Sequence, residues 1–488
     1  MSIKAVKRKI KKILIANRGE IALRILRTVK EMGLLAVVVY EKPDQHAYYI
    51  RIAEEAVLIG DGPRKDYLDI DRMIWAATKT GADAIHPGYG FLAENADFAS
   101  ACERAGIIFI GPPPKLIRNL GEKVLAREIV KRADLPFIPG TYNLSSGEEG
   151  IREAISFGNQ YGYPIMIKAS AGGGGRGIRK VQNQAELANS VKRARAEARK
   201  AFKNENIYVE KCIESPRHVE IQILADYYGN VIHLGSRDCS IQRRHQKLLE
   251  LAPAALPPEV LDAMYAAAIR AAREVGYVNA GTVEFLVDPQ TNQFWFMEMN
   301  TRLQVEHTVT EELVNIDIIR EQINIAEGKP LTIPAERIQL RGKAVQVRIN
   351  AEDPLNNFMP DGGKNIDVYL PPGGPGVRLD GIIYQGYRIP TEYDSLLVKM
   401  TVRGYNWEQT VQRLQCALDL FLIVGPKTTI PFYRAICMDS DFREERFDTG
   451  YIQTHPHVLE YPEPVHGITK LEKFISGVHS PVFFPYIY

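Results

Sequence analysis

The chain contains few cysteines and almost no excess of either charge sign, and both scarcities exclude classes of protein. Its five cysteines lie far apart along 488 residues, and no C-x-x-C pair occurs. This argues against a disulfide framework and a zinc site, and it indicates a reducing compartment. The 61 basic and 59 acidic residues leave a net charge of +2, which is not typical of a dedicated nucleic-acid or membrane-surface protein. We therefore expect a cytoplasmic protein with no nucleic-acid partner and no membrane attachment.

Long apolar runs are missing as well. No stretch approaches the ~20 residues that cross a bilayer. Residues 13–16, which follow the basic N-terminus, are too short for a signal-peptide core. At 488 residues the chain exceeds what one hydrophobic core usually serves, so we expect several domains.

The chain does contain one dense glycine run, residues 172–177, after a short apolar strand pattern that ends in Lys168. The backbone N–H groups of Gly173, Gly174 and Gly175 can approach a bulky anion closely, and Lys168 adds a positive charge. The run is neither a P-loop nor a dinucleotide-binding loop, because both of those open a helix. We interpret it as a mobile lid over nucleotide phosphates, although the run alone also fits a mobile linker.

The first part of the chain alternates strand and helix patterns. This predicts a Rossmann-like parallel sheet with helices on both faces, the α/β class. We place this domain at residues 1–114, where a proline run ends it. Its expected strands are 12–16, 36–40, 84–86 and 107–110, and its expected helices are 20–32, 66–80 and 95–105.

The remaining chain predicts an α+β arrangement. We expect a helical linker at 115–138 and a small lid domain at 139–212, which contains the glycine run and a charged helix at 184–201. A larger mixed domain follows at 213–458, with helices at 258–275 and 311–327. Residues 459–488, which are rich in proline and aromatics, read as an extension.

Two carboxylates face each other in a predicted β-hairpin. If Asp288–Asn292 forms the turn, Glu284 lies opposite Glu298, and Asn300 shares their face. At about 5 Å the carboxylates repel by about 3 kcal/mol at an effective dielectric of about 20. A divalent cation between them removes that repulsion, and these oxygen ligands suit Mg²⁺ or Mn²⁺ on nucleotide phosphates. The alternative is a solvated sheet face, which the apolar neighbours of both glutamates disfavour.

The segment after the hairpin combines three functional groups that suit a small oxyanion. Arg302 can hold such an anion through paired N–H donors, Gln304 can orient it, and Glu306 can take a proton from it. A structural ion-pair loop is the alternative.

Two further cationic sites stand out. In the cluster 243–247, Lys247 and His245 would stabilise transferring charge if they face the phosphates. A solvated charged face is the ordinary alternative for such a cluster. Arg348, between apolar neighbours on a strand pattern, is either a buried ion-pair partner or a cation directed at a substrate anion.

Together these residues resemble the biotin carboxylase component of biotin-dependent carboxylases, a branch of the ATP-grasp superfamily. The resemblance covers about residues 10 to 455, and the joint order and spacing of its motifs are specific. The matching segments are 15–22 (IANRGEIA), 86–92 (HPGYGFL), 94–95, 168–177, 210–211, 216–220, 237–240, 243–247, 298–307 (EMNTRLQVEH) and 348–353 (RINAED).

The resemblance implies a role for each matching residue. It places Lys123 and Lys168 at the ATP phosphates, Glu210, Lys211 and the Ile213 backbone at the adenine, and His218 close to the nucleotide. It places two metal ions at Glu284 and Glu298, and bicarbonate at Lys247, Arg302, Gln304 and the Val305 backbone. Glu306 would be the base, and Arg348 would stabilise the biotin enolate. Biotin would lie near Tyr89, and Arg24 would contact the second subunit of a homodimer.

The implied reaction uses ATP, bicarbonate and biotin. Bicarbonate attacks the γ-phosphate, carboxyphosphate releases CO₂, and the biotin enolate captures it. The closest string to a biotinyl site is 397–400, which contains Lys399 on a strand pattern and reads as structural. We therefore expect biotin on a separate carrier protein and a separate carboxyltransferase subunit, with pyruvate or acetyl-CoA as the acceptor. Another ATP-grasp ligase and a catalytically silent nucleotide-binding subunit remain as alternatives.

Overall fold

The computed structural model describes residues 8–121, 132–171, 177–331, 333–334 and 337–460. The predictions on Lys123, Gly173, Gly174 and Gly175, and on the extension beyond residue 460, lie outside the described residues. Among the helices that are described, none is long and apolar enough to cross a membrane.

A five-stranded parallel sheet forms the N-terminal unit, in the order β3-β2-β1-β4-β5. Helix α1 packs on it because its apolar stripe, which includes Ile21, Ile25 and Val29, is fully buried. The elements are β1 Lys12–Ile15, α1 Gly19–Glu31, β2 Leu35–Glu41, α2 Tyr48–Ile52, β3 Glu55–Gly60, α3 Ile70–Thr80, β4 Ala84–His86, α4 Ala96–Arg104, β5 Ile108–Phe109 and α5 Pro114–Gly121.

Two details of this unit differ from the sequence prediction. The helix predicted at 66–80 is split into a 3-10 turn, Asp66–Leu68, and α3, because Asp69 caps α3 by accepting the Arg72 N–H. Strand β3 was not predicted, because it is an edge strand whose exposure lacks a clean alternation.

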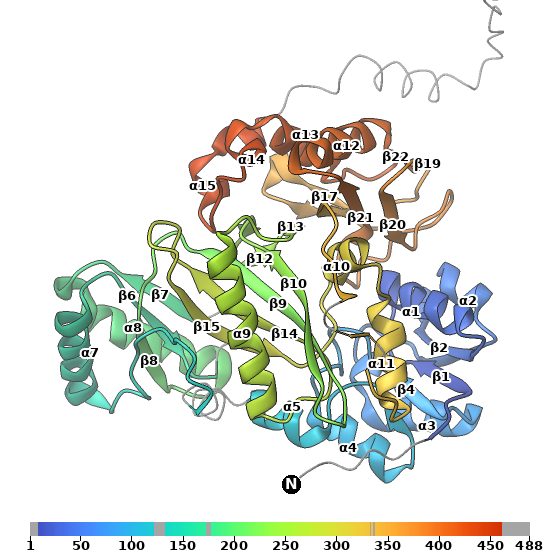
Figure 1. Cartoon of the computed structure of the whole chain (residues 1–488), viewed down its shortest axis with the longest axis horizontal. Coiled ribbons are helices and arrows are strands. Elements are labelled where there is room, and N and C mark those ends of the chain that lie inside the picture. The colour runs from blue at the N-terminus through green and yellow to red at the C-terminus, as the bar shows by residue number, and fades with distance from the viewer. Residues whose placement is uncertain (1–7, 122–131, 172–176, 332, 335–336, 461–488) are drawn as a thin grey trace, which may run out of the picture.

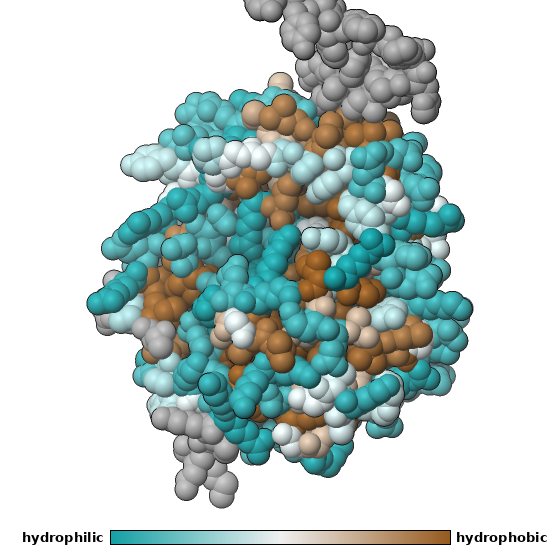
Figure 2. Space-filling view, turned by 90° about the vertical axis from the view of Figure 1, so that its right-hand side faces the viewer, coloured by the Kyte–Doolittle hydropathy of each residue, from teal (hydrophilic) through white to brown (hydrophobic). Residues whose placement is uncertain are grey.

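The side of the molecule seen in Figure 2 has apolar patches between hydrophilic side chains.

A small antiparallel sheet, in the order β7-β6-β8, forms the unit between the two larger ones in sequence. Its charged helix α8 buries only a narrow stripe, Leu187, Val191, Ala194 and Ala198, against the sheet. The elements are α7 Gly147–Tyr161, β6 Ile165–Ala169, β7 Ile178–Val181, α8 Gln184–Phe202 and β8 Ile207–Lys211.

An eight-stranded sheet, in the order β15-β14-β9-β10-β13-β16-β21-β20, forms the centre of the molecule. Figure 1 shows it between the β6–β8 unit on the left and the N-terminal unit on the right. Its strands are β9 Arg217–Ala225, β10 Val231–Asp238, β13 Leu249–Ala252, β14 Asn279–Val287, β15 Phe294–Asn300, β16 Lys343–Asn350, β20 Val377–Gly381 and β21 Leu396–Gly404. Short pairs β11 Gln242–Arg243 with β12 Gln246–Lys247, β17 Glu352–Asp353 with β18 Met359–Pro360, and β19 Val368–Leu370 with β22 Leu422–Val424 accompany it.

The helices of this part include one correction. The single helix predicted at 311–327 is two helices, because Asn315 adopts a left-handed conformation (φ 55°) that ends the first and Asp317 caps the second. The helices are α9 Pro258–Glu274, α10 His307–Val314, α11 Ile318–Ala326, α12 Trp407–Leu420, α13 Ile430–Met438, α14 Ser440–Arg443 and α15 Tyr451–Thr454. One hydrophobic cluster joins the α1 face of the N-terminal sheet to the central sheet, so the two units share a core.

Candidate active site

A row of charged residues crosses four neighbouring strands of the central sheet. Glu284 of β14 is the direct partner of Glu298 on β15, which confirms the predicted pairing; a register shift follows between Glu284 and Phe285. On its other side Glu284 pairs with Glu220 of β9, and Glu220 pairs with Arg237 of β10. Directly paired residues project from the same face, so three carboxylates and one guanidinium share this face.

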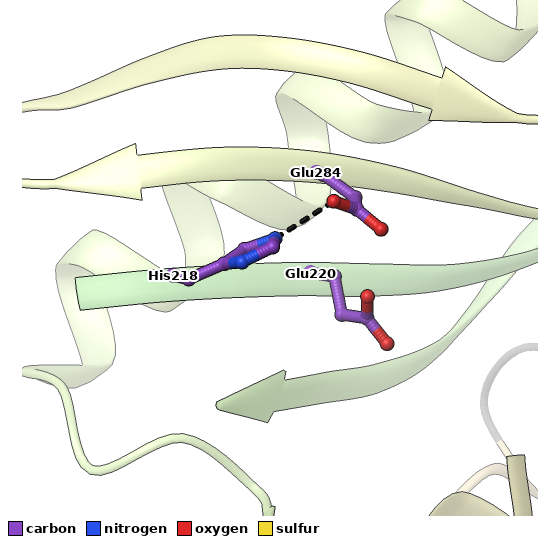
Figure 3. Close-up of side chains that lie close together, drawn as sticks. All are labelled: His218, Glu220 and Glu284. Atoms are coloured by element: carbon purple, nitrogen blue, oxygen red, sulfur yellow. Dashed lines mark hydrogen bonds and ion pairs between the residues drawn. The ribbon is translucent and has the colours of Figure 1, made fainter. Parts of the chain in front are cut away.

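Glu284 is the most heavily bonded carboxylate of the row. His218 Nε2 lies 2.7 Å from its Oε2 (Figure 3), and Asn300 Nδ2 and Gln304 Nε2 donate to its Oε1 at 2.8 and 3.0 Å. Lys247 Nζ donates to the same Oε1 at 3.2 Å. Burial alone would raise the pKa of Glu284, but Lys247 and His218 outweigh it and lower this pKa. Glu284 is therefore ionised at neutral pH.

Glu298 lies in different surroundings. Its side chain is exposed, and desolvation by the surrounding protein, followed by the charge of Glu284, raises its pKa. The facing carboxylates and the Asn300 amide oxygen are the hard oxygen donors that Mg²⁺ or Mn²⁺ prefers. Glu284 and Glu298 would hold such a cation; the third predicted ligand, Asn300, directs its Nδ2 at Glu284 and its Oδ1 at Arg302 in this structure.

Lys247 is the cation at the centre of the cluster. It comes from the short hairpin β11–β12, and its Nζ donates to Glu220 at 2.7 Å, to Glu306 at 2.7 Å and to Glu284 at 3.2 Å. Burial favours the neutral amine, but the acidic groups around it raise the pKa of Lys247 well above its usual value. One ammonium group thus neutralises carboxylates from three separate segments.

Glu306 precedes α10 and is buried between Lys247 and Arg348. Its Oε2 accepts from Arg348 Nη2 at 3.2 Å, and the same Nη2 also bonds the buried Glu250. Burial opposes ionisation of Glu306, but Lys247, and to a smaller extent Arg348, lower its pKa. The pKa of Glu250 is raised by burial, which Arg348 only partly offsets. Arg348 is therefore a half-buried ion-pair partner of two buried carboxylates, and its part in binding a substrate anion stays a prediction.

Arg302 organises the loop between β15 and α10. Its Nη1 donates to Gln304 Oε1 at 2.8 Å and its Nη2 to Asn300 Oδ1 at 3.1 Å. Its Nε donates to Glu94, from the N-terminal unit, at 2.8 Å. The loop predicted to hold an oxyanion is thus connected to the metal-ligand candidates on one side and to the N-terminal unit on the other.

The predicted nucleotide contacts are more scattered. Lys168 Nζ lies 2.5 Å from Glu210 Oε2, across the strand pair β6–β8. Lys211 Nζ donates to the Gly162 carbonyl at 3.1 Å. Ile213 is half-buried just after β8, and His245 is exposed at the β11–β12 turn with a left-handed φ of 62°. His218 is the predicted nucleotide residue that the structure joins to the carboxylate cluster.

Two other predicted residues contact distant parts of the chain. Tyr89 is half-buried, with Lys399 Nζ 5.6 Å from its ring centroid. Arg24 is buried within this chain, where its Nη2 bonds Glu311 and Asp317 at 2.9 Å. Arg24 therefore acts inside the subunit in this structure, whatever it contributes to a contact between subunits.

Sequence reasoning assigned no role to four residues that complete the cluster. These are Glu94, Glu220, Arg237 and Glu250. A sequence signal existed for Glu250, which interrupts the apolar run 248–251, whereas Glu220 stands at a polar position of an alternating strand; the structure buries both completely. A buried carboxylate in such a strand requires a cation, and the cation comes here from a distant segment.

Three family models match the chain in succession. They describe the biotin carboxylase N-terminal domain (residues 9–117), the carbamoyl-phosphate synthase L chain ATP-binding domain (122–333) and the biotin carboxylase C-terminal domain (346–454). Biotin carboxylase 1 of Bacillus subtilis (strain 168) is 49% identical over 448 residues, covering 91% of this chain and 99% of that protein. The chain belongs to the biotin carboxylase family. Family membership and the ATP-dependent ligase class are thus confirmed.

Other biotin carboxylases are similar in sequence and structure over nearly the whole chain. The 2-oxoglutarate carboxylase small subunit of Hydrogenobacter thermophilus is 47% identical over 454 residues, 93% of this chain and 95% of that protein. A crystal structure of the biotin carboxylase domain dimer of that carboxylase, in complex with MgADP, ADP and bicarbonate, matches with a TM-score of 0.88 at 46% identity. The match covers 93% of this chain and 100% of that chain. The predicted fold, a parallel N-terminal sheet followed by an ATP-grasp architecture, is confirmed.

Proposed function

We propose that the cluster around Lys247 carries out the ATP-dependent carboxylation of biotin, through carboxyphosphate. The observation that supports this most directly is that Lys247, Glu306 and Arg348 form one chain of contacts beside Glu284. A base and two cations thus lie next to the carboxylates that suit a metal on a triphosphate. Such a site must hold small anions and stabilise their charge, which is what this arrangement of groups provides.

In the first step a bicarbonate oxygen forms a bond to the γ-phosphorus of ATP and the bond to ADP breaks. Arg302, Gln304, Lys247 and the Val305 backbone hold the bicarbonate, and Glu306 accepts its proton. The low pKa of Glu306 ensures that it is ionised before bicarbonate binds. Glu284 and Glu298 would hold a divalent cation, which would neutralise charge on the phosphates.

In the second step carboxyphosphate breaks into CO₂ and phosphate. The phosphate takes the N1 proton of biotin, and the resulting enolate forms a bond to CO₂. Arg348 stabilises the negative charge of the enolate, and Tyr89 lies beside the biotin. The contacts of Arg348 with Glu250 and Glu306 keep its guanidinium group oriented before biotin enters.

The nucleotide is assigned to the face between the β6–β8 unit and the central sheet. Lys123, Lys168 and the glycine run from Gly173 to Gly175 hold its phosphates, with His245 nearby. Glu210, Lys211 and the Ile213 backbone hold the adenine, and His218 lies beside the nucleotide. The assignment assumes five proposed parts of the chain. They are a Rossmann-like domain at 1–114, a linker at 115–138, a lid at 139–212, a carboxylase domain at 213–458 and an extension at 459–488.

The partners are proposed from the resemblance to biotin carboxylases. The enzyme acts on biotin carried by a separate carrier protein and works with a carboxyltransferase subunit, as a homodimer in the cytoplasm. The small-subunit name of the Hydrogenobacter relative and the domain dimer support a subunit of a larger carboxylase. The five cysteines, all free, suit a reducing compartment. The acceptor is proposed to be a small carboxylate or thioester such as pyruvate or acetyl-CoA.

The test is ATP cleavage with bicarbonate and Mg²⁺, followed as ADP release with and without free biotin. Stimulation by biotin is expected, and it also requires bicarbonate. An equal rate of ATP cleavage with and without biotin would favour another ATP-grasp ligase. No ATP cleavage would favour a catalytically silent nucleotide-binding subunit. Either outcome would overturn the proposal.

A further inference from the structure

Lys399 is a lysine without exposed side-chain surface, and the chemistry proposed above gives it no role. It lies in β21, directly between its cross-strand partners Arg348 of β16 and Asp380 of β20. The three residues form one row across the sheet, so their side chains share a face. A second charged row, on strands remote from the β14–β15 hairpin, thus passes through the predicted enolate-stabilising arginine.

The ammonium group of Lys399 reaches the backbone of the catalytic loop. Its Nζ donates to the Val305 carbonyl at 2.9 Å, 94 residues away in the sequence. The neighbouring carbonyls are bonded to the first turn of α10: Gln304 accepts from the His307 N–H and Glu306 from the Val309 N–H. The Val305 carbonyl takes its bond from a side chain instead. This bond therefore fixes the peptide unit between Val305 and Glu306, one residue after Gln304.

Lys399 also reaches the N-terminal unit. Its Nζ lies 3.2 Å from Glu20 Oε1, in the first turn of α1, and 5.6 Å from the centre of the Tyr89 ring, within the range of a cation–π contact. Burial opposes ionisation of Asp380, but Arg378 and Lys399 outweigh it and lower its pKa, so Asp380 is ionised at neutral pH. One buried cation thus touches the loop of the base, the ring assigned to the biotin pocket and the start of α1.

Burying an ammonium group is costly unless every donor finds a partner. An apolar side chain of similar volume often fills such a place without loss of stability, so packing alone does not require a lysine here. What an apolar side chain cannot do is hold the Val305 carbonyl. We propose that Lys399 is a positioning residue that orients Gln304 and Glu306 through the Val305 peptide. The proposal rests on the bicarbonate chemistry proposed above.

The test compares Lys399→Met with the double variant Glu20→Gln/Lys399→Met. The single variant removes the bond to Val305, and the double variant also removes the carboxylate that has lost its partner. Thr401→Val is the matched control: Thr401 is buried two residues further on β21, and its hydroxyl bonds Thr308 at 2.7 Å without touching the loop. Steady-state kinetics for ATP and bicarbonate, and thermal unfolding, are measured for each variant.

Both Lys399 variants are expected to lose about 10²-fold in kcat, because a misplaced reacting group costs a factor of this size. Their KM for bicarbonate should rise while their KM for ATP stays at the wild-type value; a merely structural role would lower the active fraction and move neither KM. Thr401→Val should keep the wild-type kcat. A double variant with wild-type kcat and KM would overturn the proposal, and so would one that does not fold, since Lys399 would then support the fold. Both results are read against an active wild type, whereas failure of the proposed function would appear in the wild type itself.

Discussion

Glu284 and Glu298 are direct partners across the β14–β15 hairpin, yet only the side chain of Glu284 is buried from solvent. Glu284 is buried and bonded to a histidine, a lysine and two amides, which lower its pKa. Glu298 is exposed, and its pKa is raised. The hairpin therefore presents one carboxylate that the protein has already neutralised and one that is still available to a ligand.

This difference predicts opposite effects of two matched substitutions. Glu298→Gln removes an exposed charge and relieves repulsion, so unfolding free energy should stay within about 0.5 kcal/mol of wild type. Glu284→Gln removes the carboxylate partner of His218 and one of the three carboxylates around Lys247, and should cost about 3 kcal/mol. Urea unfolding without nucleotide measures both. Equal losses of stability in the two variants would contradict the assignment.

Glu298→Gln should nevertheless impair catalysis. With one of the two facing carboxylates gone, the Mg²⁺ concentration for half-maximal ATP cleavage should rise. Titration of Mg²⁺ at saturating ATP and bicarbonate measures the shift. An unchanged Mg²⁺ requirement would show that Glu298 does not hold the cation.

Glu306→Gln tests the base. The amide keeps the volume of Glu306 but cannot accept the bicarbonate proton, so biotin-dependent ATP cleavage should be abolished. Nucleotide binding, measured by calorimetry with ADP and Mg²⁺, should persist because no predicted nucleotide contact is changed. Wild-type turnover in this variant would refute the role of Glu306.

The sequence predicted the parts of this site that depend on local spacing. The pairing of Glu284 with Glu298 follows from strand alternation and a short turn, and the structure has that pairing. The loop from Arg302 to Glu306 follows directly in the chain, so its functional groups were also visible. The N-terminal parallel sheet was predicted from its alternating patterns, except for its edge strand β3.

Long-range partners could not be predicted in the same way. Lys399 was interpreted as a structural residue on a strand, which its place in β21 agrees with, but its bond to Val305 spans 94 residues. Glu250 meets Arg348 because β13 and β16 are neighbours, which requires the strand order. Local periodicity shows which residues are buried, whereas tertiary topology decides which charges meet.

Glu20 predicts a pH dependence of stability. Burial, which Lys399 only partly offsets, raises the pKa of Glu20 from 4.5 to about 7. The folded state then binds a proton more tightly than the unfolded chain, so wild-type stability falls as pH rises from about 4.5 to about 7, by up to about 3 kcal/mol. Glu20→Gln lacks this loss. Its unfolding free energy relative to wild type should therefore increase over that interval in urea titrations, and parallel curves would contradict the raised pKa.

From the position of Lys247 we predict that a divalent cation can replace its ammonium group in neutralising the surrounding carboxylates. In the protein without ligands, its ammonium group neutralises Glu220, Glu284 and Glu306 together. Lys247→Met leaves these buried carboxylates facing one another, with Arg237 and Arg348 as the remaining cations nearby, so the melting temperature should fall.

Mg²⁺ should recover part of that loss, because oxygen donors grouped around a missing positive charge bind a hard cation. The expected result is a larger rise in melting temperature on adding MgCl₂ to Lys247→Met than to wild type, without nucleotide. Arg243→Met on the same hairpin is the control, because Arg243 bonds Asn357 outside the cluster; its response to Mg²⁺ should match wild type. An equal rise in melting temperature in all three proteins would contradict this prediction. It would mean that in Lys247→Met the carboxylates are neutralised by protons, because relief of their repulsion would then not depend on Mg²⁺.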